Sequence, residues 1–448
     1  MQTRREFLKS GAMSTAGLAM VGMGVPSNLF ARMAGANDKV RVGVIGFSDR
    51  FRNSLLPAFQ ANAKDFNFEI VAVSDIWKLR REEAVKHFKE KYNQDIKVFR
   101  NNEELYDARI CDAVIVSTAD FQHARHCIEA VQAGCDAYVE KPFAETMEDA
   151  RAALKAVKES GRIVQIGSQR RSAPNYQAAN EYLRSGKFGK ITMVEMTWNV
   201  NQPGRWRRKA LVEKCFEADT DWNRFLLNRP KEAWDPRKYL EYRLFWPFSS
   251  GIPGQWMSHQ IDTVHWFTGL NHPLSVAAGG GIYQWNDGRR NFDTVTAVFE
   301  YGTPNADDHF QVLYTSRMHN SAGDVKELYF SNGGTLNLDT NEVSSTGGMT
   351  EHFAGEMGMK ANLLEKFKLP DVKIETSSNT GGDPMTYLHM RNWMECVRSR
   401  KTPNAPAQAG YNHSIATIMC NAALRTGEKV TFDEKSQNVM AGKKVFKY

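Results

Sequence analysis

Short apolar runs alternate with longer charged segments between residues 39 and 168. The runs are rich in β-branched residues and cover 39–45, 68–74, 113–117, 136–140 and 163–168. The segments between them carry helical patterns at 77–92, 123–133 and 147–160. Continuous apolar strands separated by helices predict a parallel sheet that is covered by helices on both faces. We therefore predict a doubly wound α/β domain over residues 37–168.

The pattern changes to longer, alternating strands after residue 189. These strands cover 191–199, 274–283, 293–301, 309–316 and 325–331. Sequential strands of this kind predict a large, mainly antiparallel sheet that leaves one face open. An aromatic-rich insertion, 198–248, separates the first two strands, and helical patterns return at 384–398 and 412–426. Residues 169–448 are thus predicted to form an α+β domain whose C-terminal helices pack back, with 343–383 as a long surface excursion.

The N-terminus has the pattern of a targeting segment. Residues 3–9 read Thr-Arg-Arg-Glu-Phe-Leu-Lys, a weakly apolar stretch follows at 11–25, and small residues stand at 34–36. This arrangement is typical of a twin-arginine signal peptide over 1–36. A membrane anchor, the alternative, needs roughly 20 apolar residues, and the apolar stretch is shorter. We expect export to the periplasm, no stable membrane insertion after signal removal, and tight retention of any cofactor that is acquired before export.

Size and composition narrow the classes of protein further. The chain has 448 residues, and at roughly 100–200 residues per domain this favours two domains. The formal net charge is +7, of which the leader holds +3, from four basic residues against one acidic residue. No Lys/Arg stripe is interleaved with aromatic residues, so a nucleic-acid partner is not expected. The six cysteines are irregularly spaced and are expected to be buried rather than paired. No CxxC or HxxxH pattern occurs, so no metal site is expected.

The end of the first strand carries part of a dinucleotide fingerprint. A G-x-G-x-x-G turn would place glycine at positions 46, 48 and 51, and only Gly46 is present. Ser48 offers a hydroxyl to a phosphate, whereas Phe51 puts a ring where helix and strand usually meet. Arg50 is either a partner for the pyrophosphate or a solvated surface residue. We predict a nicotinamide dinucleotide site at this turn.

The second strand ends in a carboxylate, Asp75. A carboxylate at this place accepts hydrogen bonds from the adenosine ribose hydroxyls, which favours NAD. Lys78, Arg80 and Arg81 follow closely, and they are either partners for a 2′-phosphate or a solvated helix face. NADP therefore stays open.

Three further motifs occur in order along the chain. They are the segment from Ser117 to His123, Glu140-Lys141-Pro142, and Gly167-Ser168-Gln169-Arg170. With these motifs the chain resembles the Gfo/Idh/MocA family of oxidoreductases, and its C-terminal segments 392–401 and 431–433 resemble the exported bacterial branch. The resemblance implies a Rossmann domain with cofactor contacts at Ser117, Thr118, His123, Glu140, Lys141 and Gln169.

Lys141 suits the chemistry that this resemblance implies. Oxidising a secondary alcohol requires removal of the hydroxyl proton while the carbon donates hydride to a nicotinamide. A lysine beside a positively charged nicotinamide has a lowered pKa, which helps it to share that proton. We predict that Lys141 is catalytic, and the alternative is an exposed lysine after an edge strand.

Residues 255–262 contain a second catalytic candidate, His259. The segment resembles the family's D-x-x-x-H-x-x-D helix, in which the histidine is the acid/base group. Gln255 stands in place of the first carboxylate and cannot relay a proton. Helical spacing puts 255, 259 and 262 on one face, and Asp262 is predicted to orient His259. The alternative is a capped histidine in the core.

Tryptophans and arginines crowd residues 198–256 and suit the flat faces and the polar or acidic groups of a sugar. Substrate contacts are predicted at Lys141, Arg170, Asn199, Gln255, His259 and Asp262. The leading hypothesis is an NAD(P)-dependent dehydrogenase of a sugar, polyol or glycoside. A glycosidase that acts through transient oxidation and a redox-inactive sugar-binding protein stay open. The open sheet face is expected to join copies of the chain into a homo-oligomer.

Overall fold

The computed structural model describes residues 38–371 and 383–447, and the predicted signal peptide lies outside them. The first sheet has six parallel strands in the order β3-β2-β1-β4-β5-β6. They are β1 (Val40–Ile45), β2 (Phe68–Ser74), β3 (Lys97–Phe99), β4 (Ala113–Val116), β5 (Asp136–Val139) and β6 (Val164–Ile166). This confirms the predicted doubly wound domain. β3 escaped prediction because it is only three residues long and largely exposed, so it has no apolar run.

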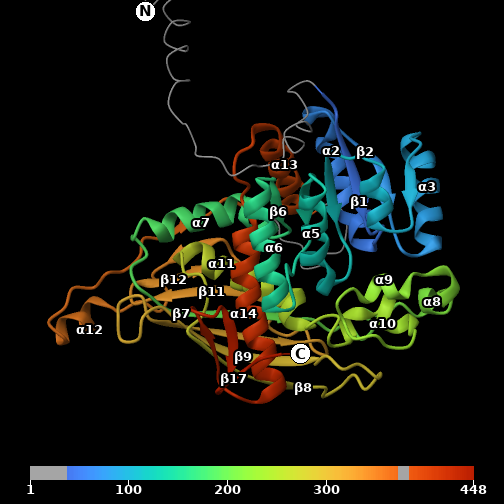
Figure 1. Ribbon diagram of the computed structural model, residues 1–448. Helices are drawn as coiled ribbons and strands as arrows, with labels where there is room; N and C mark the ends of the chain where they lie inside the picture. The colour runs from blue at the N-terminus through green and yellow to red at the C-terminus, as the bar shows by residue number, and fades with distance from the viewer. Residues whose placement is uncertain (1–37, 372–382, 448) are drawn as a thin grey trace, which may run out of the picture. The chain divides into compact units, whose positions relative to one another are not determined.

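Two layers of helices cover this sheet. One apolar cluster joins the sheet to α2 (Leu56–Phe66), α3 (Lys78–Tyr92) and α13 (Pro384–Ser399). The other face packs on α4 (Asn102–Asp107), α5 (His123–Gln132) and α6 (Met147–Ser160). Figure 1 shows α13 beside α2, although more than 300 residues separate them in sequence. The side chain of Trp393 in α13 is fully buried and lies edge-on to Phe68 and Tyr138. A C-terminal helix therefore completes the core of the N-terminal domain.

The second sheet has eleven strands in the order β14-β13-β12-β11-β7-β10-β9-β8-β15-β16-β17. Only the central pair, β7 and β10, is parallel. The strands are β7 (Ile191–Asn199), β8 (Ser275–Gly281), β9 (Thr294–Tyr301), β10 (Phe310–Arg317), β11 (Val325–Ser331), β12 (Gly334–Asn337), β13 (Glu342–Ser344), β14 (Phe367–Lys368), β15 (Val430–Asp433), β16 (Asn438–Ala441) and β17 (Lys444–Val445). The predicted α+β domain with a large, mainly antiparallel sheet is confirmed.

Burial alternates along the central strands of this sheet. In β9, Val295, Ala297, Phe299 and Tyr301 are buried, and the residues between them are partly or fully exposed. The buried face packs against α7 (Pro174–Arg184), α11 (Ser258–Thr268) and α14 (Ala407–Thr426). The opposite face is open, as a period of two residues predicts.

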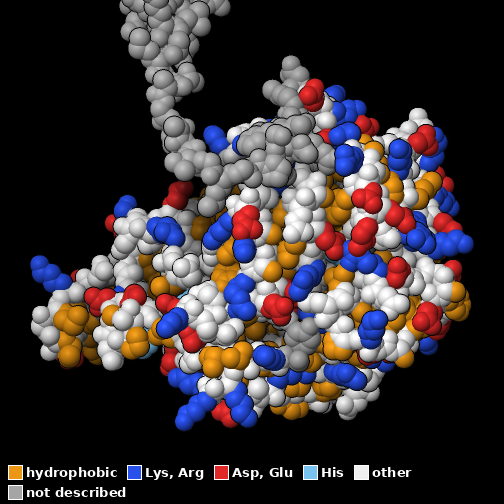
Figure 2. Space-filling model, viewed as in Figure 1, with side chains coloured by type: hydrophobic (Ala, Val, Ile, Leu, Met, Phe, Trp, Pro, Cys, Tyr) orange, Lys and Arg blue, Asp and Glu red, His pale blue; other side chains and the backbone are white. Residues whose placement is uncertain are grey.

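The segment expected as a surface excursion is partly structured. It contains α12 (Glu351–Glu356) and β14, which adds an edge strand to the large sheet. Leu364 and Leu369 anchor it through buried side chains. At α12 and just after it, by contrast, Phe353, Met357 and Met359 are exposed. Figure 2 shows hydrophobic side chains on the surface in the region where Figure 1 labels α12. The Ser/Thr/Gly composition concealed these apolar anchors, but most side chains from 345 to 371 are exposed, so this part of the segment lies at the surface as predicted. Residues 372–382 lie outside the described residues.

The insertion between β7 and α11 folds into short helices. They are α8 (Lys209–Val212), α9 (Trp222–Leu226) and α10 (Pro236–Leu240). These helices lie together below α3, at one end of the parallel sheet (Figure 1). An antiparallel bridge pairs Thr220 with Trp77, and the Gln122 amide donates to the Phe225 carbonyl. The insertion is thereby fastened to the edge of the first domain.

The remaining sequence predictions concern the cysteines, metals and the membrane. All six cysteines are buried, as predicted. Within residues 38–371 and 383–447, no three His, Cys, Asp or Glu side chains gather in a metal-binding group. Over the same residues, no helix combines the length and apolarity that crossing a bilayer requires.

Candidate active site

The turn after β1 has room only for glycine at its first position. Gly46 has φ +86°, and an added Cβ would lie 2.9 Å from the Thr118 methyl and 3.1 Å from the Ser117 carbonyl oxygen. Both the backbone angle and the close approach exclude a side chain here. The one fingerprint glycine that the sequence retains is therefore the one that the turn needs.

The other two fingerprint positions are filled differently. The Ser48 hydroxyl accepts the Phe51 N–H at 3.2 Å and contacts the Ser117 hydroxyl at 3.1 Å, so it caps the following helix. The Phe51 ring is fully buried and packs on Phe47, with ring centres 5.8 Å apart. The helix begins at Asp49 and continues as the π segment η2 (Phe51–Leu55), a form that is often found at functional sites. The ring therefore belongs to the core and does not enter the site.

A cavity of about 510 Å³ opens at this turn. All ten residues predicted to bind the cofactor line it: Gly46, Ser48, Arg50, Asp75, Ser117, Thr118, His123, Glu140, Lys141 and Gln169. Two more predicted residues, Gln255 and His259, line it from the second domain. A cavity at the carboxyl ends of parallel strands is the usual ligand site of this architecture.

One end of the cavity is formed by Asp75, Asp49 and their neighbours. The Asp75 carboxylate accepts the Phe47 N–H at 2.8 Å and the Trp77 N–H at 2.9 Å, and burial raises its pKa. Each oxygen retains a lone pair for a hydroxyl. Asp49 pairs with Arg80 at 3.1 Å and Arg208 at 3.3 Å. This end of the cavity thus offers the Asp75 carboxylate as an acceptor, and the charges of Arg80 and Arg208 beside it are balanced by Asp49.

Arg50 and Glu140 form an ion pair in the middle of the cavity. Arg50 Nε lies 3.0 Å from Glu140 Oε1, and both side chains are nearly buried. The predicted choice for Arg50 was a pyrophosphate partner or a solvated surface residue. Its side chain is only 12% exposed, so Arg50 is not a solvated surface residue. It lines the cavity, and its role as a pyrophosphate partner stays a prediction. His123 bonds the carbonyls of Pro142 and Thr118 at 2.8 and 3.2 Å and so ties the two neighbouring loops together.

Lys141 lies at the opposite end of the cavity from Asp75. Its Nζ donates to the Gln255 carbonyl oxygen at 2.6 Å. Burial is the main cause that lowers its pKa, to about 7, and Arg243 and Arg50 lower it further against the opposing effect of Glu140 and Asp120. An amine with this pKa is a usable proton acceptor near neutral pH.

His259 lies beside Lys141 and is nearly buried. Its ring stacks on Trp198 with centres 5.8 Å apart. Among the described residues, no side chain or backbone group hydrogen-bonds its ring nitrogens. Burial, together with Lys141 and Arg170, holds its pKa well below the usual range. The imidazole is therefore neutral and free to bind a hydroxyl in the cavity.

A buried carboxylate that the sequence analysis missed, Asp120, supports this end of the site. Its Oδ2 accepts the Gln255 amide at 2.5 Å and the Ser249 hydroxyl at 2.6 Å. Its Oδ1 is buried with no partner in the described part of the chain. The Gln255 oxygen in turn accepts Arg243 Nε at 2.8 Å. Asp120 lies inside the motif from Ser117 to His123, and only its charge within an apolar segment could have drawn attention to it.

Three predicted substrate residues lie outside the cavity lining. Arg170 pairs with buried Glu327, and the Asn199 amide donates to the Ala322 carbonyl. Asp262 accepts two hydrogen bonds from Arg171, at 2.7 and 3.0 Å, and also lies near His413. The prediction that Asp262 orients His259 was wrong, because Arg171, from the segment that follows β6, takes both carboxylate oxygens.

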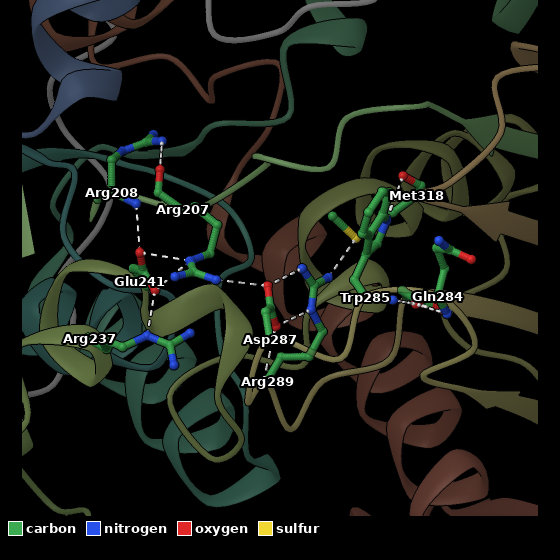
Figure 3. A network of polar contacts seen from close by, with 10 residues as sticks. Arg207, Arg208, Arg237, Glu241, Gln284, Trp285, Asp287, Arg289 and Met318 are labelled. Carbon is green, nitrogen blue, oxygen red and sulfur yellow. Dashed lines mark hydrogen bonds and ion pairs between the residues drawn. The ribbon is translucent and has the colours of Figure 1, made fainter. Parts of the chain in front are cut away.

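The loop before α8 approaches the cavity and is held by a buried carboxylate (Figure 3). Glu241 accepts Arg207 Nε at 3.0 Å, the Arg208 N–H at 2.7 Å and Arg237 Nε at 2.9 Å. Asp287 also binds Arg207, at 3.1 Å. These contacts fix the backbone that presents Arg205 and Arg208 to the cavity.

Comparison with known proteins agrees with this geometry. Residues 40–168 match the family model GFO_IDH_MocA, described as an oxidoreductase family with an NAD-binding Rossmann fold. Over these residues the chain is similar to the Gfo/Idh/MocA oxidoreductase family. An inositol 2-dehydrogenase of Salmonella typhimurium is 25% identical over 239 residues, which is 53% of this chain and 65% of that enzyme. The chain thus spans less than two thirds of this relative's length.

Two further relatives extend the Gfo/Idh/MocA comparison. The NAD(+)-dependent scyllo-inositol 2-dehydrogenase of Bacillus subtilis is 36% identical over 123 residues, 27% of this chain and 34% of that enzyme. The crystal structure of the WlbA dehydrogenase from Bordetella pertussis, in complex with NADH and UDP-GlcNAcA, aligns with a TM-score of 0.62. The alignment covers 88% of this chain and 99% of that one at 17% identity, so it shows the shared two-domain fold.

The residues of the first domain that line the cavity fit a nicotinamide dinucleotide. The backbone at Gly46 has no side chain to obstruct a close approach, and the helix capped by Ser48 begins beside it. Asp75 lines one end of the cavity, where the ribose hydroxyls would be held, and Lys141 lines the other. Of the three basic residues that follow Asp75, Arg80 pairs with Asp49 and Glu83, Lys78 lies 3.9 Å from Glu82, and Arg81 donates to the Asp75 carbonyl oxygen. This residue set fits a nicotinamide dinucleotide, NAD or NADP.

Proposed function

We propose that this chain is an NAD(P)-dependent oxidoreductase that acts on a hydroxyl-bearing carbon of a sugar or polyol, with NAD as the preferred cofactor. The observation that carries the proposal is one cavity shared by two features. The Gly46 turn lies at one part of it, and the Lys141 amine with its pKa near 7 lies at another, next to the unbonded ring of His259. The sugar and inositol dehydrogenases among its relatives support the same activity.

The site residues divide the work of alcohol oxidation. The bound nicotinamide supplies the hydride acceptor. Neutral Lys141 accepts the hydroxyl proton, because burial has removed the preference of its amine for the charged form. His259 holds the same hydroxyl through its neutral imidazole, and Gln255 keeps Lys141 in place through its carbonyl oxygen. Gln255 cannot carry a proton itself, so this task falls to Lys141 and His259.

The decisive experiment looks first for the cofactor and then for the reaction. Purified protein is denatured, and the released material is examined by absorbance and mass spectrometry. We expect NAD, or binding of added NAD in preference to NADP. Sugars and polyols should then reduce the bound cofactor, whereas aryl glycosides should not be cleaved. Absence of any nicotinamide binding would leave a sugar-binding protein, and cleavage of aryl glycosides would favour the oxidation-assisted glycosidase.

We further propose that the chain is exported through its N-terminal segment. The paired Arg4 and Arg5, the short apolar stretch and the small residues at 34–36 support this. In a twin-arginine-competent bacterium, the protein should appear in the periplasmic fraction with a new N-terminus near residue 37. Replacing both arginines by lysine should keep the full-length chain in the cytoplasm, and unchanged export of that variant would contradict the proposal.

We also propose that two copies meet through the open face of the large sheet. Leu313 lies there between Val298 and Glu195 on the neighbouring strands and is only partly exposed. A broad, partly apolar sheet face is suited to pack against the same face of a second copy of the chain. Light scattering should give more than one chain per particle, and Leu313→Glu should lower that number. Val85→Glu, at an exposed position of α3 in the first domain, is the matched control.

A further inference from the structure

Six arginines line the cavity: Arg50, Arg80, Arg205, Arg208, Arg224 and Arg243. Four of them are paired with carboxylates of the chain. Arg50 binds Glu140, Arg80 and Arg208 bind Asp49, and Arg224 binds Glu103 and Glu129. Arg205 and Arg243 have no carboxylate partner among the described residues. The positive charge of the cavity is thus left uncompensated at these two side chains.

Arg205 is the less well satisfied of the two. Its Nη1 donates to the Gln202 amide oxygen at 2.6 Å, and its Nε is buried with no hydrogen-bond partner in the described residues. Burial and repulsion from Arg243 and Arg208 lower its pKa to about 10. A guanidinium in such surroundings is stabilised when an anion supplies the missing acceptor and charge.

Arg243 is directed to the reacting end of the cavity. It donates through Nε to Gln255, the residue whose carbonyl binds Lys141. Arg205 lies over the Trp256 ring, with 5.7 Å from guanidinium to ring centre. Trp256 stacks in turn on Trp198, which stacks on His259. Both arginines therefore belong to the Lys141 and His259 end and not to the Asp75 end.

Arg205 precedes a residue with a strained backbone conformation, which its neighbours keep in place. The next residue, Trp206, has φ +66°, in the left-handed region that a bulky side chain rarely adopts. Its ring is buried against Trp256, and the Glu241 network fixes the two residues that follow (Figure 3). Strained conformations kept by surrounding contacts occur at ligand sites. The buried Trp206 ring and the Glu241 network thus hold Arg205 where its side chain lines the cavity.

We propose that Arg205 and Arg243 bind an anionic substituent, a carboxylate or a phosphate, on the sugar that Lys141 and His259 act upon. The substrate class is then an acidic sugar, such as a uronic acid or a sugar phosphate, and not a neutral hexose or inositol. The planar guanidinium forks match both anions through paired hydrogen bonds. This inference rests on the proposed function, because it assigns the substrate of the same site.

The test measures binding and does not depend on hydride transfer. The full chain, with the cofactor it carries, is titrated calorimetrically with D-glucuronate, D-galacturonate and D-glucose 6-phosphate, and with neutral D-glucose and D-galactose. We expect at least one anionic sugar to bind about 10-fold or more tightly than its neutral parent, a difference of about 1.4 kcal/mol. The stronger of the carboxylate and phosphate arms identifies the anion.

Substitutions assign this preference to the two arginines. Arg205→Gln and Arg243→Gln should each remove most of the preference for the anionic sugar. Arg205→Lys keeps the charge and loses the planar fork, so it should retain part of the preference for the anionic sugar. This variant replaces Arg205→Gln in the titration if Arg205→Gln does not fold. The matched control is Arg290→Gln, at an exposed arginine outside the cavity. It should bind as the unaltered protein does.

Two results would overturn the inference. One is that every neutral parent binds as tightly as its anionic counterpart. The other is that Arg205→Gln weakens the binding of NAD and leaves the sugar preference intact, which would assign the anion site to the cofactor pyrophosphate. Failure of the proposed function is distinguishable, because a protein without any cofactor still reports the sugar preference in the titration.

Discussion

At Lys141, burial decides the protonation state. The pKa of its amine falls from 10.5 to about 7, so the amine is charged below this pH and neutral above it. Because only the neutral amine accepts the hydroxyl proton, kcat/KM for sugar oxidation should rise with pH and level off above about 7. A profile that is flat from about pH 5 to about pH 9 would be inconsistent with this role. Lys141→Met should lower kcat by about 10²-fold or more while bound cofactor persists.

Asp120 tunes that same amine through its charge. Its carboxylate raises the pKa of Lys141, and it holds Gln255, which binds the Lys141 amine. Asp120→Asn removes the charge and keeps hydrogen-bonding atoms, so the pH midpoint of kcat/KM should move below its original value. The control, Ser249→Ala, removes another partner of Asp120 without removing charge and should leave the midpoint in place. A shift of the Asp120→Asn midpoint to higher pH would count against this assignment.

How far single residues could be predicted depended on whether their partners were close in sequence. Gly46, Asp75 and Lys141 follow strands directly, so the order of strands places them at one edge of a sheet. Asp262 and Arg170 are bound by Arg171 and Glu327, from elements far along the chain. No spacing rule reveals such partners, and both side chains therefore lie elsewhere than predicted.

In the turn between β1 and the helix that follows it, one fingerprint position requires glycine and another does not. Gly46 has a backbone angle and neighbours that exclude a side chain. Ser48 contributes a cap, whose loss to glycine costs only a few tenths of a kcal/mol. Gly46→Val should therefore abolish NAD binding in a fluorescence titration, whereas Ser48→Gly should retain it. Loss of binding in Ser48→Gly would show that the serine hydroxyl itself holds the cofactor.

Whole elements were predictable where the apolar period was long. Five strands of each sheet and the helices over 77–92 and 147–160 were found in this way. β3 and the strands from β12 to β17 were not, because none has more than four residues, and they gain order by joining a sheet that other strands have built. The contact between the insertion and the first domain could not be predicted from the sequence either, since the Trp77 to Thr220 bridge joins segments over 140 residues apart.

For the molecule as a whole, the C-terminal helix α13 packs into the core of the N-terminal domain. Trp393 is fully buried between Phe68 of β2 and Tyr138 of β5. Trp393→Ala should lower the free energy of unfolding by about 3–5 kcal/mol. Thermal unfolding should detect this loss, with Tyr387→Ala, at an exposed position of the same helix, as the control. Equal melting temperatures for the two variants would mean that α13 contributes little to this core.

The same helix sets an order of events during synthesis. A ribosome makes residues 40–168 early, and N-terminal domains generally fold first as they emerge. Here, however, an apolar face of that domain stays uncovered until residues 384–399 have left the ribosome, about nine tenths of the way along the chain. The nucleotide-binding half therefore reaches its final form only when translation is almost finished. A nascent chain that is halted before this point exposes the apolar residues of the first sheet that Trp393 and its neighbours cover in the finished protein.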